Sequence, residues 1–423
     1  MASYIRVQGG SHLAGEVKIG GAKNSALKLM AAAILGGGLT TLHNVPKISD
    51  VEIMTKVLAC FNVKVERDGN TLYIDASDVQ DSEAPYKYVS KMRASIAVLG
   101  PLIARFHHAR VAMPGGCKIG ARKIDMHLIG LKEIGVNFEN YHGMLEATIP
   151  DKLKGADVVL NFASVGATEN MLMACVCAEG KSVIDNAAQE PEIADLCDML
   201  NAMGAKITGG GTSRIEVEGV PIEEFHPCEH TTVGDRIEAG TFLVGGALTG
   251  GPVSVKGVSP DYLRMAILKL EEMGCIINSG QDWISVERDT SKLLNPIEIQ
   301  TLPHPGFPTD LQAQFILLCA FADGTSVVSE NIFENRFMFA SELMRMGADI
   351  TLEGHHAIIH GPCTLLGAEV SSTDLRAGAS LVLAGLVAKG FTDVYKLKHI
   401  DRGYEGFTEK LASLGANIER FDD

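Results

Sequence analysis

Positive charge and aromatic side chains are both scarce in this sequence of 423 residues. Lysine and arginine total 37 against 52 aspartate and glutamate residues, the net charge is −15, and aromatic residues make up 6%. This balance argues against a general nucleic-acid binder, which needs a broad cationic face. A local cluster of cations around an anionic small molecule stays possible, because charges are screened beyond about 8 Å.

Long apolar runs, a secretory leader and a disulfide framework are also missing. Glycine and polar residues interrupt every long apolar run, and the N-terminal MASYIRVQGG has no apolar core behind a basic start. The nine cysteines are odd in number and mostly embedded in apolar segments, which is typical of reduced thiols. We therefore expect a soluble, cytoplasmic protein, and the length favours two or three domains.

A short pattern recurs six times: a helix-like segment ends at Gly or Asn, and a strand-like alternating run follows. The Gly or Asn positions, spaced 68 to 73 residues apart, are Asn62, Gly135, Gly204, Gly274, Gly347 and Gly415. In each copy we expect an amphipathic helix, a left-handed residue just after it, and then a β-hairpin.

A second helix-like segment also recurs six times and is apolar on nearly every face, which predicts burial. The copies begin near residues 25, 92, 167, 236, 311 and 375. A continuous solenoid is the alternative, but three repeats closing around their own helices, twice over, bury these segments better. We expect two α/β domains with a cleft between them, residues 22–232 and residues 233–423, with residues 1–21 adding a strand to the second.

Cations stand in the first turn of four of these buried helices, at Lys23, Arg93, Arg236 and Arg376. A helix N-terminus carries partial positive charge and free N–H groups, so it suits anions and opposes cations. We interpret these four residues as candidate anion ligands. Thr309 and Thr373, in contrast, are expected to be ordinary helix caps.

The segment MPGGCKIGARKID, residues 113–125, combines glycines, three basic residues and Cys117. Neighbouring cations lower the pKa of a thiol, so Cys117 could donate a proton or attack an electrophile. The alternative is a plain surface cysteine in a flexible loop. The length and glycine content of the segment suit a lid.

Three further loops carry candidate residues. In HPGFPTDLQAQF, prolines lead to Asp310, which serves either the helix dipole or a ligand. The loops with Arg336 and Arg402 occupy the same place in their repeats as the Cys117 segment occupies in its own. Function often concentrates on equivalent loops of a scaffold.

Together these motifs resemble the UDP-N-acetylglucosamine enolpyruvyl transferase (1-carboxyvinyltransferase) family over essentially the whole chain. The resemblance rests on GGAKNSAL, MRASI, PGGCKIGAR, SVGAT, NAAQEPEI, DRIEAGTF, FPTDLQAQF, FENRFM, TDLRAGASLVLAG and HIDRGYE. It implies two inside-out α/β barrel domains (EPT/RTPC-like fold) of three repeats each, with the active site in the interdomain cleft. It also implies transfer of the enolpyruvyl group from phosphoenolpyruvate to the 3′-hydroxyl of UDP-N-acetylglucosamine, with release of phosphate, in peptidoglycan precursor synthesis.

The resemblance further implies the roles of individual residues. Cys117 matches the catalytic cysteine that fosfomycin alkylates, Asp310 the base, and Lys23 and Arg402 the groups at phosphoenolpyruvate. The substrate-binding set is Lys23, Asn24, Arg93, Arg122, Lys123, Ile124, Asp125, Met126, Ser164, Val165, Asp310, Ile332, Arg336, Arg376 and Arg402. No metal and no other cofactor is implied. The sequence departs from common family residues at Ala97, Lys123 and Phe162, which bears on the nucleotide and phosphate contacts.

Two alternatives stay open. A 3-phosphoshikimate enolpyruvyl transferase shares the fold and the donor but lacks a cysteine loop of this kind. A non-catalytic repeat protein that binds a nucleotide sugar or a partner belongs to a different functional class. The sequence does not indicate whether the chain is a monomer or a dimer.

Overall fold

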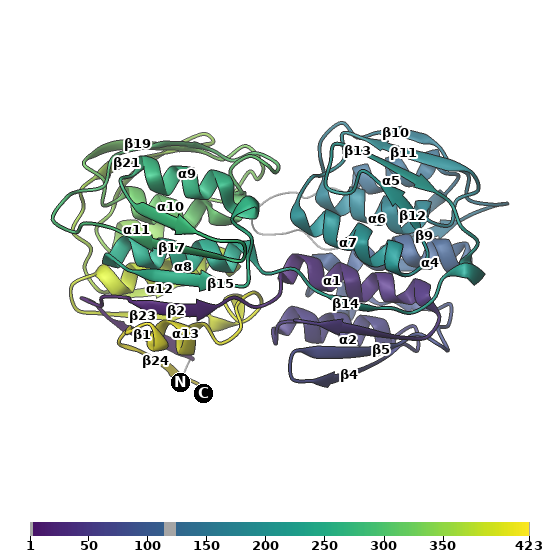
Figure 1. Cartoon of the computed structure of the whole chain (residues 1–423), viewed down its shortest axis with the longest axis horizontal. Coiled ribbons are helices and arrows are strands. Elements are labelled where there is room, and N and C mark those ends of the chain that lie inside the picture. Colours follow the sequence, from purple (N-terminus) through teal and green to yellow (C-terminus); the bar gives the residue numbers. More distant parts are fainter. Residues whose placement is uncertain (1–2, 114–123, 423) are drawn as a thin grey trace. The chain divides into compact units, whose positions relative to one another are not determined.

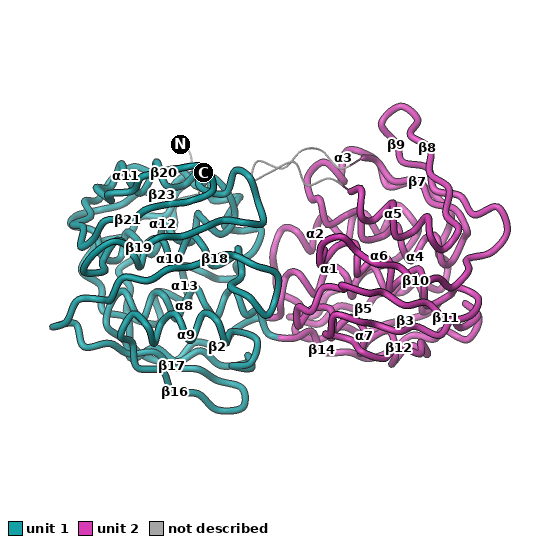
Figure 2. Tube along the Cα trace, turned by 90° about the horizontal axis from the view of Figure 1, so that it is seen from above, with its two compact units in different colours: residues 1–20, 118–120, 234–423 teal, residues 21–117, 121–233 magenta. Residues whose placement is uncertain are grey.

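The computed structural model describes residues 3–113 and 124–422, which form two compact units. Unit 1 contains residues 3–20 and 234–422, and unit 2 contains residues 21–113 and 124–233 (Figure 2). Each unit has its own hydrophobic core. The sequence predicted limits at residues 21/22 and 232/233, one residue from these junctions, and the division into domains stays a prediction.

The described residues form six four-stranded sheets, three in each unit, which correspond to the six repeats (Figure 1). Those of unit 2 are β14 (Glu229–Thr231)-β3 (Leu39–His43)-β5 (Thr71–Asp75)-β4 (Lys64–Asp68), β6 (Glu83–Ala84)-β7 (His108–Ala112)-β9 (Met144–Thr148)-β8 (Asn137–Tyr141), and β10 (Asp157–Val159)-β11 (Lys181–Asp185)-β13 (Arg214–Glu218)-β12 (Lys206–Thr208). Those of unit 1 are β2 (Gly15–Lys18)-β15 (Val253–Lys256)-β17 (Trp283–Glu287)-β16 (Ile276–Ser279), β18 (Glu298–Gln300)-β19 (Gly324–Ser329)-β21 (His356–Gly361)-β20 (Asp349–Glu353), and β22 (Glu369–Ser371)-β23 (Phe391–Tyr395)-β1 (Tyr4–Gln8)-β24 (Ile418–Phe421). In every sheet the first strand runs parallel to the second, and the remaining pairs are antiparallel.

The N-terminal residues contribute two strands to unit 1, not the one that was expected. Strand β2 pairs in parallel with β15, and β1 takes the place of a hairpin partner beside β24. The last repeat needs this partner because β24 has no following hairpin strand of its own in the described chain. The short run GEVK of β2 carries one buried residue, too little alternation for a sequence pattern to reveal it.

The amphipathic helix of each repeat ends as predicted. These helices are α2 (Ser49–Ala59), α5 (Asp125–Glu133), α7 (Pro191–Ala202), α9 (Arg264–Glu272), α11 (Ala340–Arg345) and α13 (Phe407–Ser413). Shortly after each, the expected Gly or Asn has positive φ, from 61° at Asn62 to 108° at Gly204. The left-handed conformation releases the chain from the helix into the next strand, so this prediction is confirmed.

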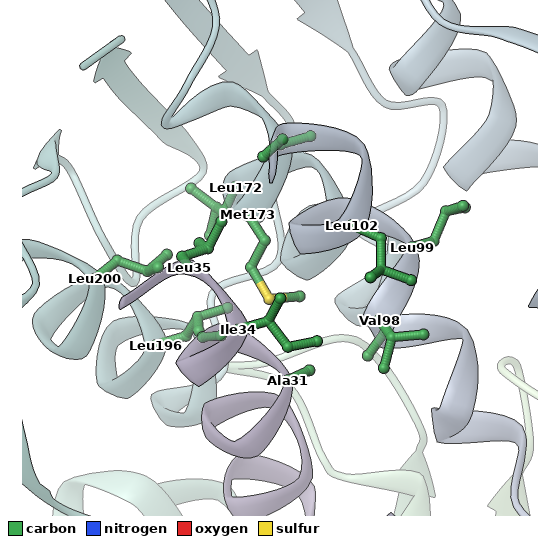
Figure 3. Close-up of a cluster of buried hydrophobic side chains, with 14 of the residues drawn as sticks. Ala31, Ile34, Leu35, Val98, Leu99, Leu102, Leu172, Met173, Leu196 and Leu200 are labelled. Carbon is green, nitrogen blue, oxygen red and sulfur yellow. The ribbon is translucent and has the colours of Figure 1, made fainter. Parts of the chain in front are cut away.

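The apolar helices lie in the cores, as expected. They are α1 (Lys23–Ala32) continued by η1 (Ala33–Gly36), η2 (Arg93–Val98) with α4 (Leu99–Phe106), α6 (Val165–Cys175), α8 (Arg236–Thr249), η5 (Thr309–Leu311) with α10 (Gln312–Cys319), and α12 (Leu375–Val387). Figure 3 shows side chains such as Ile34, Leu102, Met173 and Leu196 meeting in the core of unit 2. The second copy begins as the 3-10 segment η2, and Pro101, which has no backbone N–H to donate, stands in the first turn of the α-helix that follows.

The remaining short helices connect these elements: α3 (Tyr86–Val89), η3 (Ile222–Glu224), η4 (Pro260–Leu263) and η6 (Leu397–His399). Within the two described stretches, no helix combines the length and the hydropathy that crossing a bilayer would require.

Candidate functional site

The starts of the three buried helices of unit 1 converge on Arg376. Its Nε lies 3.5 Å from Asp310 Oδ2, its Nη2 lies 3.9 Å from Asp235 Oδ2, and its guanidinium carbon stands 5.1 Å from the centre of the Tyr404 ring. Arg376 is 3% exposed. Burial alone would lower the pKa of Arg376, but Tyr404, Asp235 and Asp310 outweigh it and raise the pKa above its usual value. Arg376 is therefore a permanent buried cation, and the contact with substrate predicted for it stays a prediction.

Asp310 is held from a second direction by Arg336. Arg336 Nη2 donates to Asp310 Oδ1 at 2.6 Å, and its Nη1 donates to Thr309 Oγ1 at 3.0 Å. The side chain of Asp310 is 25% exposed to solvent, whereas that of Arg336 is 6% exposed. Charge-assisted pairs of this kind fix a carboxylate in direction as well as in charge. Asp310 is thus an oriented, partly accessible carboxylate rather than a simple partner for a helix dipole.

The helix caps differ from those expected. Asp374, not Thr373, caps α12 by accepting from the backbone N–H groups of Arg376 and Ala377. Thr309 does not cap α10, because its hydroxyl donates to the carboxylate of Glu330. A carboxylate is the stronger acceptor for helix N–H groups, and it also offsets the cation in the first turn of α12.

Lys23, the first residue of α1 in unit 2, has a carboxylate partner that the sequence did not reveal. Its Nζ lies 2.8 Å from Oδ2 of Asp50, a fully buried residue in the first turn of α2. An acidic residue at a helix start usually serves the dipole, so nothing in the sequence set Asp50 apart. This ion pair stabilises the charge of Lys23 and so explains in part why a cation is tolerated at the start of α1. Phosphoenolpyruvate binding by Lys23 and by the neighbouring Asn24 stays a prediction.

The starts of α5 and α6 meet in unit 2 beside Arg93. A Cβ built on Gly166 would lie 3.0 Å from Cε1 of His127, so the two helix starts are close and a larger residue would press on this ring. Arg93, at the start of η2, acts electrostatically on the same histidine. The structure therefore brings together three elements, η2, α5 and α6, which at or just before their starts carry residues predicted to bind the nucleotide sugar: Arg93, Ile124, Asp125, Met126, Ser164 and Val165. Ser164 also caps α6, by accepting from Ala167 N.

A polar network inside unit 2 was missed by the sequence reasoning. Lys28 Nζ donates to the buried carboxylate of Glu169 at 3.0 Å, and Asn170 Nδ2 donates to Nδ1 of His127 at 2.8 Å. Burial raises the pKa of Glu169 to about 7 despite the opposing effect of Lys28. Burial, Arg93 and Lys28 lower the pKa of His127 to about 4. The sequence signal for Lys28 and Glu169 was a charged residue in the interior of an otherwise apolar helical segment, α1 for Lys28 and α6 for Glu169.

Sequence comparison identifies the family of this chain. A family described as EPSP synthase (3-phosphoshikimate 1-carboxyvinyltransferase) matches residues 7–411. The UDP-N-acetylglucosamine 1-carboxyvinyltransferase 1 of Halalkalibacterium halodurans is 51% identical over 98% of this chain and 94% of its own length. The UDP-N-acetylglucosamine 1-carboxyvinyltransferase 2 of Carboxydothermus hydrogenoformans is 51% identical over 99% of each chain. The chain belongs to the UDP-N-acetylglucosamine 1-carboxyvinyltransferase family.

Solved structures support the fold expected for a 1-carboxyvinyltransferase. The enolpyruvyl transferase NikO from Streptomyces tendae has a TM-score of 0.89 at 26% identity, over 99% of both chains. An EPSP synthase from Acinetobacter baumannii has a TM-score of 0.75 at 18% identity, over 99% of this chain and 100% of its own, and shows the fold alone. The predicted two-domain α/β fold of the enolpyruvyl transferases, with its six repeats, is confirmed.

Several residues that the family resemblance singles out are placed but remain untested as ligands. Ile332 follows β19, Arg402 follows η6, and Cys117, Arg122 and Lys123 lie outside the described residues. Among the departures from common 1-carboxyvinyltransferase residues, Ala97 is buried in η2, and Phe162 is 41% exposed just before α6. The roles of these residues stay predictions.

The opposite pKa shifts of His127 and Glu169 predict opposite effects on stability in acid. Neutral His127 contributes about 3 kcal/mol to the free energy of unfolding above pH 6.5, relative to the protonated form. This contribution is lost as the pH falls through about 4. Glu169 favours folding below pH 4.5, and its contribution is lost as the pH rises through about 7.

Two variants separate these effects. On acidification from pH 7 to pH 4.5, His127→Asn should lose less unfolding free energy than the parent, because asparagine takes up no proton in this range. Asn Oδ1 can still accept from Asn170, which limits the cost of the substitution itself. Glu169→Gln should lose more than the parent. Denaturant unfolding at a series of pH values measures both, and curves parallel to that of the parent in both variants would contradict the assignment.

Proposed function

We propose that this chain transfers the enolpyruvyl group of phosphoenolpyruvate to the 3′-hydroxyl of UDP-N-acetylglucosamine and releases phosphate. The observation that carries the proposal is identity of about one half, over nearly the full length, with several proteins named for this activity. Both substrates are polyanions. The cations at the starts of the buried helices therefore have a chemical purpose that helix stability alone does not supply.

In the first step, Asp310 accepts the proton of the 3′-hydroxyl as the oxygen forms a bond to C2 of phosphoenolpyruvate. The electron pair of the C2–C3 double bond takes a proton from the Cys117 thiol, which leaves a thiolate. Asp310 suits the role of base because Arg336 and Arg376 orient it while part of the carboxylate stays accessible. A base must lie within hydrogen-bond reach of the proton that it removes, so its orientation matters as much as its strength.

In the second step, the bond from C2 to the phosphate oxygen breaks and the leaving phosphate takes the proton that Asp310 accepted. C3 gives one proton to the Cys117 thiolate, which restores the thiol and the double bond of the product. Negative charge on the carboxylate and phosphate is balanced by Lys23, Arg122 and Arg402 in this scheme. Preorganised charges of this kind are usually the largest contribution to catalysis, because they need no rearrangement as the reaction proceeds. The nucleotide sugar is bound by the residues gathered around the starts of α5 and α6.

The identity of the acceptor can be tested directly. We expect phosphate release when the protein and phosphoenolpyruvate are mixed with UDP-N-acetylglucosamine, and none with shikimate 3-phosphate. Release with shikimate 3-phosphate alone would support the other enolpyruvyl transferase. Absence of release with either acceptor, from folded protein, would favour a binding protein without catalysis. A place in peptidoglycan precursor synthesis and a cytoplasmic location follow from the proposed activity and belong to the same proposal.

A further inference from the structure

Glu330, directly after β19 in unit 1, collects five hydrogen bonds on one buried carboxylate. Its Oε1 accepts from Thr301 Oγ1 at 3.0 Å and from the backbone N–H groups of Ile332 at 2.8 Å and Phe333 at 3.0 Å. Its Oε2 accepts from Thr309 Oγ1 at 2.8 Å and from Gln312 Nε2 at 3.1 Å. The residue is 3% exposed. Burial of a carboxylate is unfavourable unless its oxygens accept hydrogen bonds, and here the five surrounding donors offset the free energy of desolvation.

The two oxygens of Glu330 hold two different segments. Oε1 fixes the backbone at Ile332, and Oε2 fixes the turn that carries Asp310, through Thr309 on one side and Gln312 on the other. The connection continues beyond Thr309, because Arg336 donates both to the Thr309 hydroxyl and to Asp310. The carboxylate therefore joins the proposed base to the proposed nucleotide-contacting loop.

We propose that Glu330 is a positioning residue for the reaction: it orients Asp310 through Thr309 and Arg336, and it sets the loop at Ile332. This inference rests on the proposed function, because it assigns Asp310 and Ile332 their roles. Glu330 acts through other residues and does not itself contact substrate. An effect on turnover that is separate from an effect on nucleotide-sugar binding distinguishes positioning from general support of the fold.

Glu330→Gln provides this separation because an amide has one acceptor oxygen. Three donors require that oxygen on the Ile332 side, so the amide NH2 faces the donors of Thr309 and Gln312. The Asp310 turn loses its carboxylate acceptor, and the Thr309 hydroxyl must accept from the amide in place of donating to it, while the Ile332 loop keeps its own acceptor. We expect kcat to fall roughly 10- to 100-fold, since small displacements of a catalytic group have effects of this size, with KM for UDP-N-acetylglucosamine changed by less than about twofold.

Thr309 supplies a second variant, which keeps the Glu330 side chain and removes only one of its five donors. Thr309→Val removes the hydroxyl that links Glu330 to Arg336 and should lower kcat, whereas Thr309→Ser keeps a hydroxyl and should restore most of it. Combined with Glu330→Gln, Thr309→Val should add little further loss, because both changes break the same connection. Glu342→Gln is the matched control, since Glu342 accepts a backbone N–H from Ser371 outside this network, and it should keep the parent kcat.

Steady-state kinetics on the folded full-length variants, with folding checked by thermal unfolding, decide the matter. A selective fall in kcat for Glu330→Gln and Thr309→Val supports the inference. An unchanged kcat in both variants, or equal losses in Glu342→Gln, overturns it while the parent activity upholds the proposed function. A parent that releases no phosphate would overturn the proposed function and this inference together.

Discussion

Cys117→Ala is expected to lower kcat by roughly 10²- to 10⁴-fold, the range typical of a lost general acid. The methyl group cannot protonate C3 of phosphoenolpyruvate, so the addition step loses its proton source. Affinity for UDP-N-acetylglucosamine should stay close to that of the parent, because Cys117 itself is not among the proposed nucleotide-sugar ligands. Single-turnover kinetics and calorimetric titration with the nucleotide sugar measure the two effects separately.

Cys117→Asp is the informative companion variant. A carboxylic acid can also donate a proton, so this variant should keep measurable turnover, but it is a poor target for alkylation. Mass spectrometry after treatment with fosfomycin should find the added mass on Cys117 in the parent and no adduct in Cys117→Asp. Normal turnover in Cys117→Ala, or an adduct on another cysteine, would contradict the role assigned to Cys117.

Asp310→Asn is expected to reduce kcat over a comparable range, roughly 10²- to 10⁴-fold, because an amide does not accept the proton of the 3′-hydroxyl. The change also leaves Arg336 and Arg376, both buried, without the carboxylate that they share. We therefore expect a loss of stability as well, on the scale of about 3–5 kcal/mol for a broken buried pair. Both values can be obtained from one preparation by kinetics and by denaturant unfolding.

Asp393→Asn is the matched control for that experiment. Asp393 accepts two hydrogen bonds from Arg6, at 2.8 and 2.7 Å, in the sheet that contains β1 and β23, so its replacement also breaks an arginine–aspartate pair of unit 1. It should destabilise without a fall in kcat. If Asp310→Asn were no slower than Asp393→Asn at equal folded fraction, Asp310 would not be the base.

The repeat architecture was predictable because it depends on local rules. A Gly or Asn at a fixed place after each amphipathic helix imposes a left-handed residue, and the apolar segments have only the core to occupy. The cations at Lys23, Arg93 and Arg376 stand out in the sequence for the opposite reason, since they violate the preference of a helix start, and their role as anion ligands stays a prediction.

The contacts of the buried carboxylates of Asp50 and Glu330 were not predictable, because they join separate segments of the chain. Asp50 and Glu330 sit where an acidic residue is ordinary in sequence, at a helix start and after a strand. Only the three-dimensional arrangement shows that Asp50 pairs with Lys23, or that the carboxylate of Glu330 gathers five donors. The second N-terminal strand, β2, was missed because four residues with one buried position form no recognisable pattern.

The most direct test of the proposed activity is the mass of the nucleotide sugar recovered after incubation of the protein with phosphoenolpyruvate and UDP-N-acetylglucosamine. The account predicts a product in which one enolpyruvyl group replaces one hydrogen atom, formed in equal amount with inorganic phosphate and absent without phosphoenolpyruvate. Recovery of unaltered UDP-N-acetylglucosamine from a folded, substrate-saturated protein would contradict it.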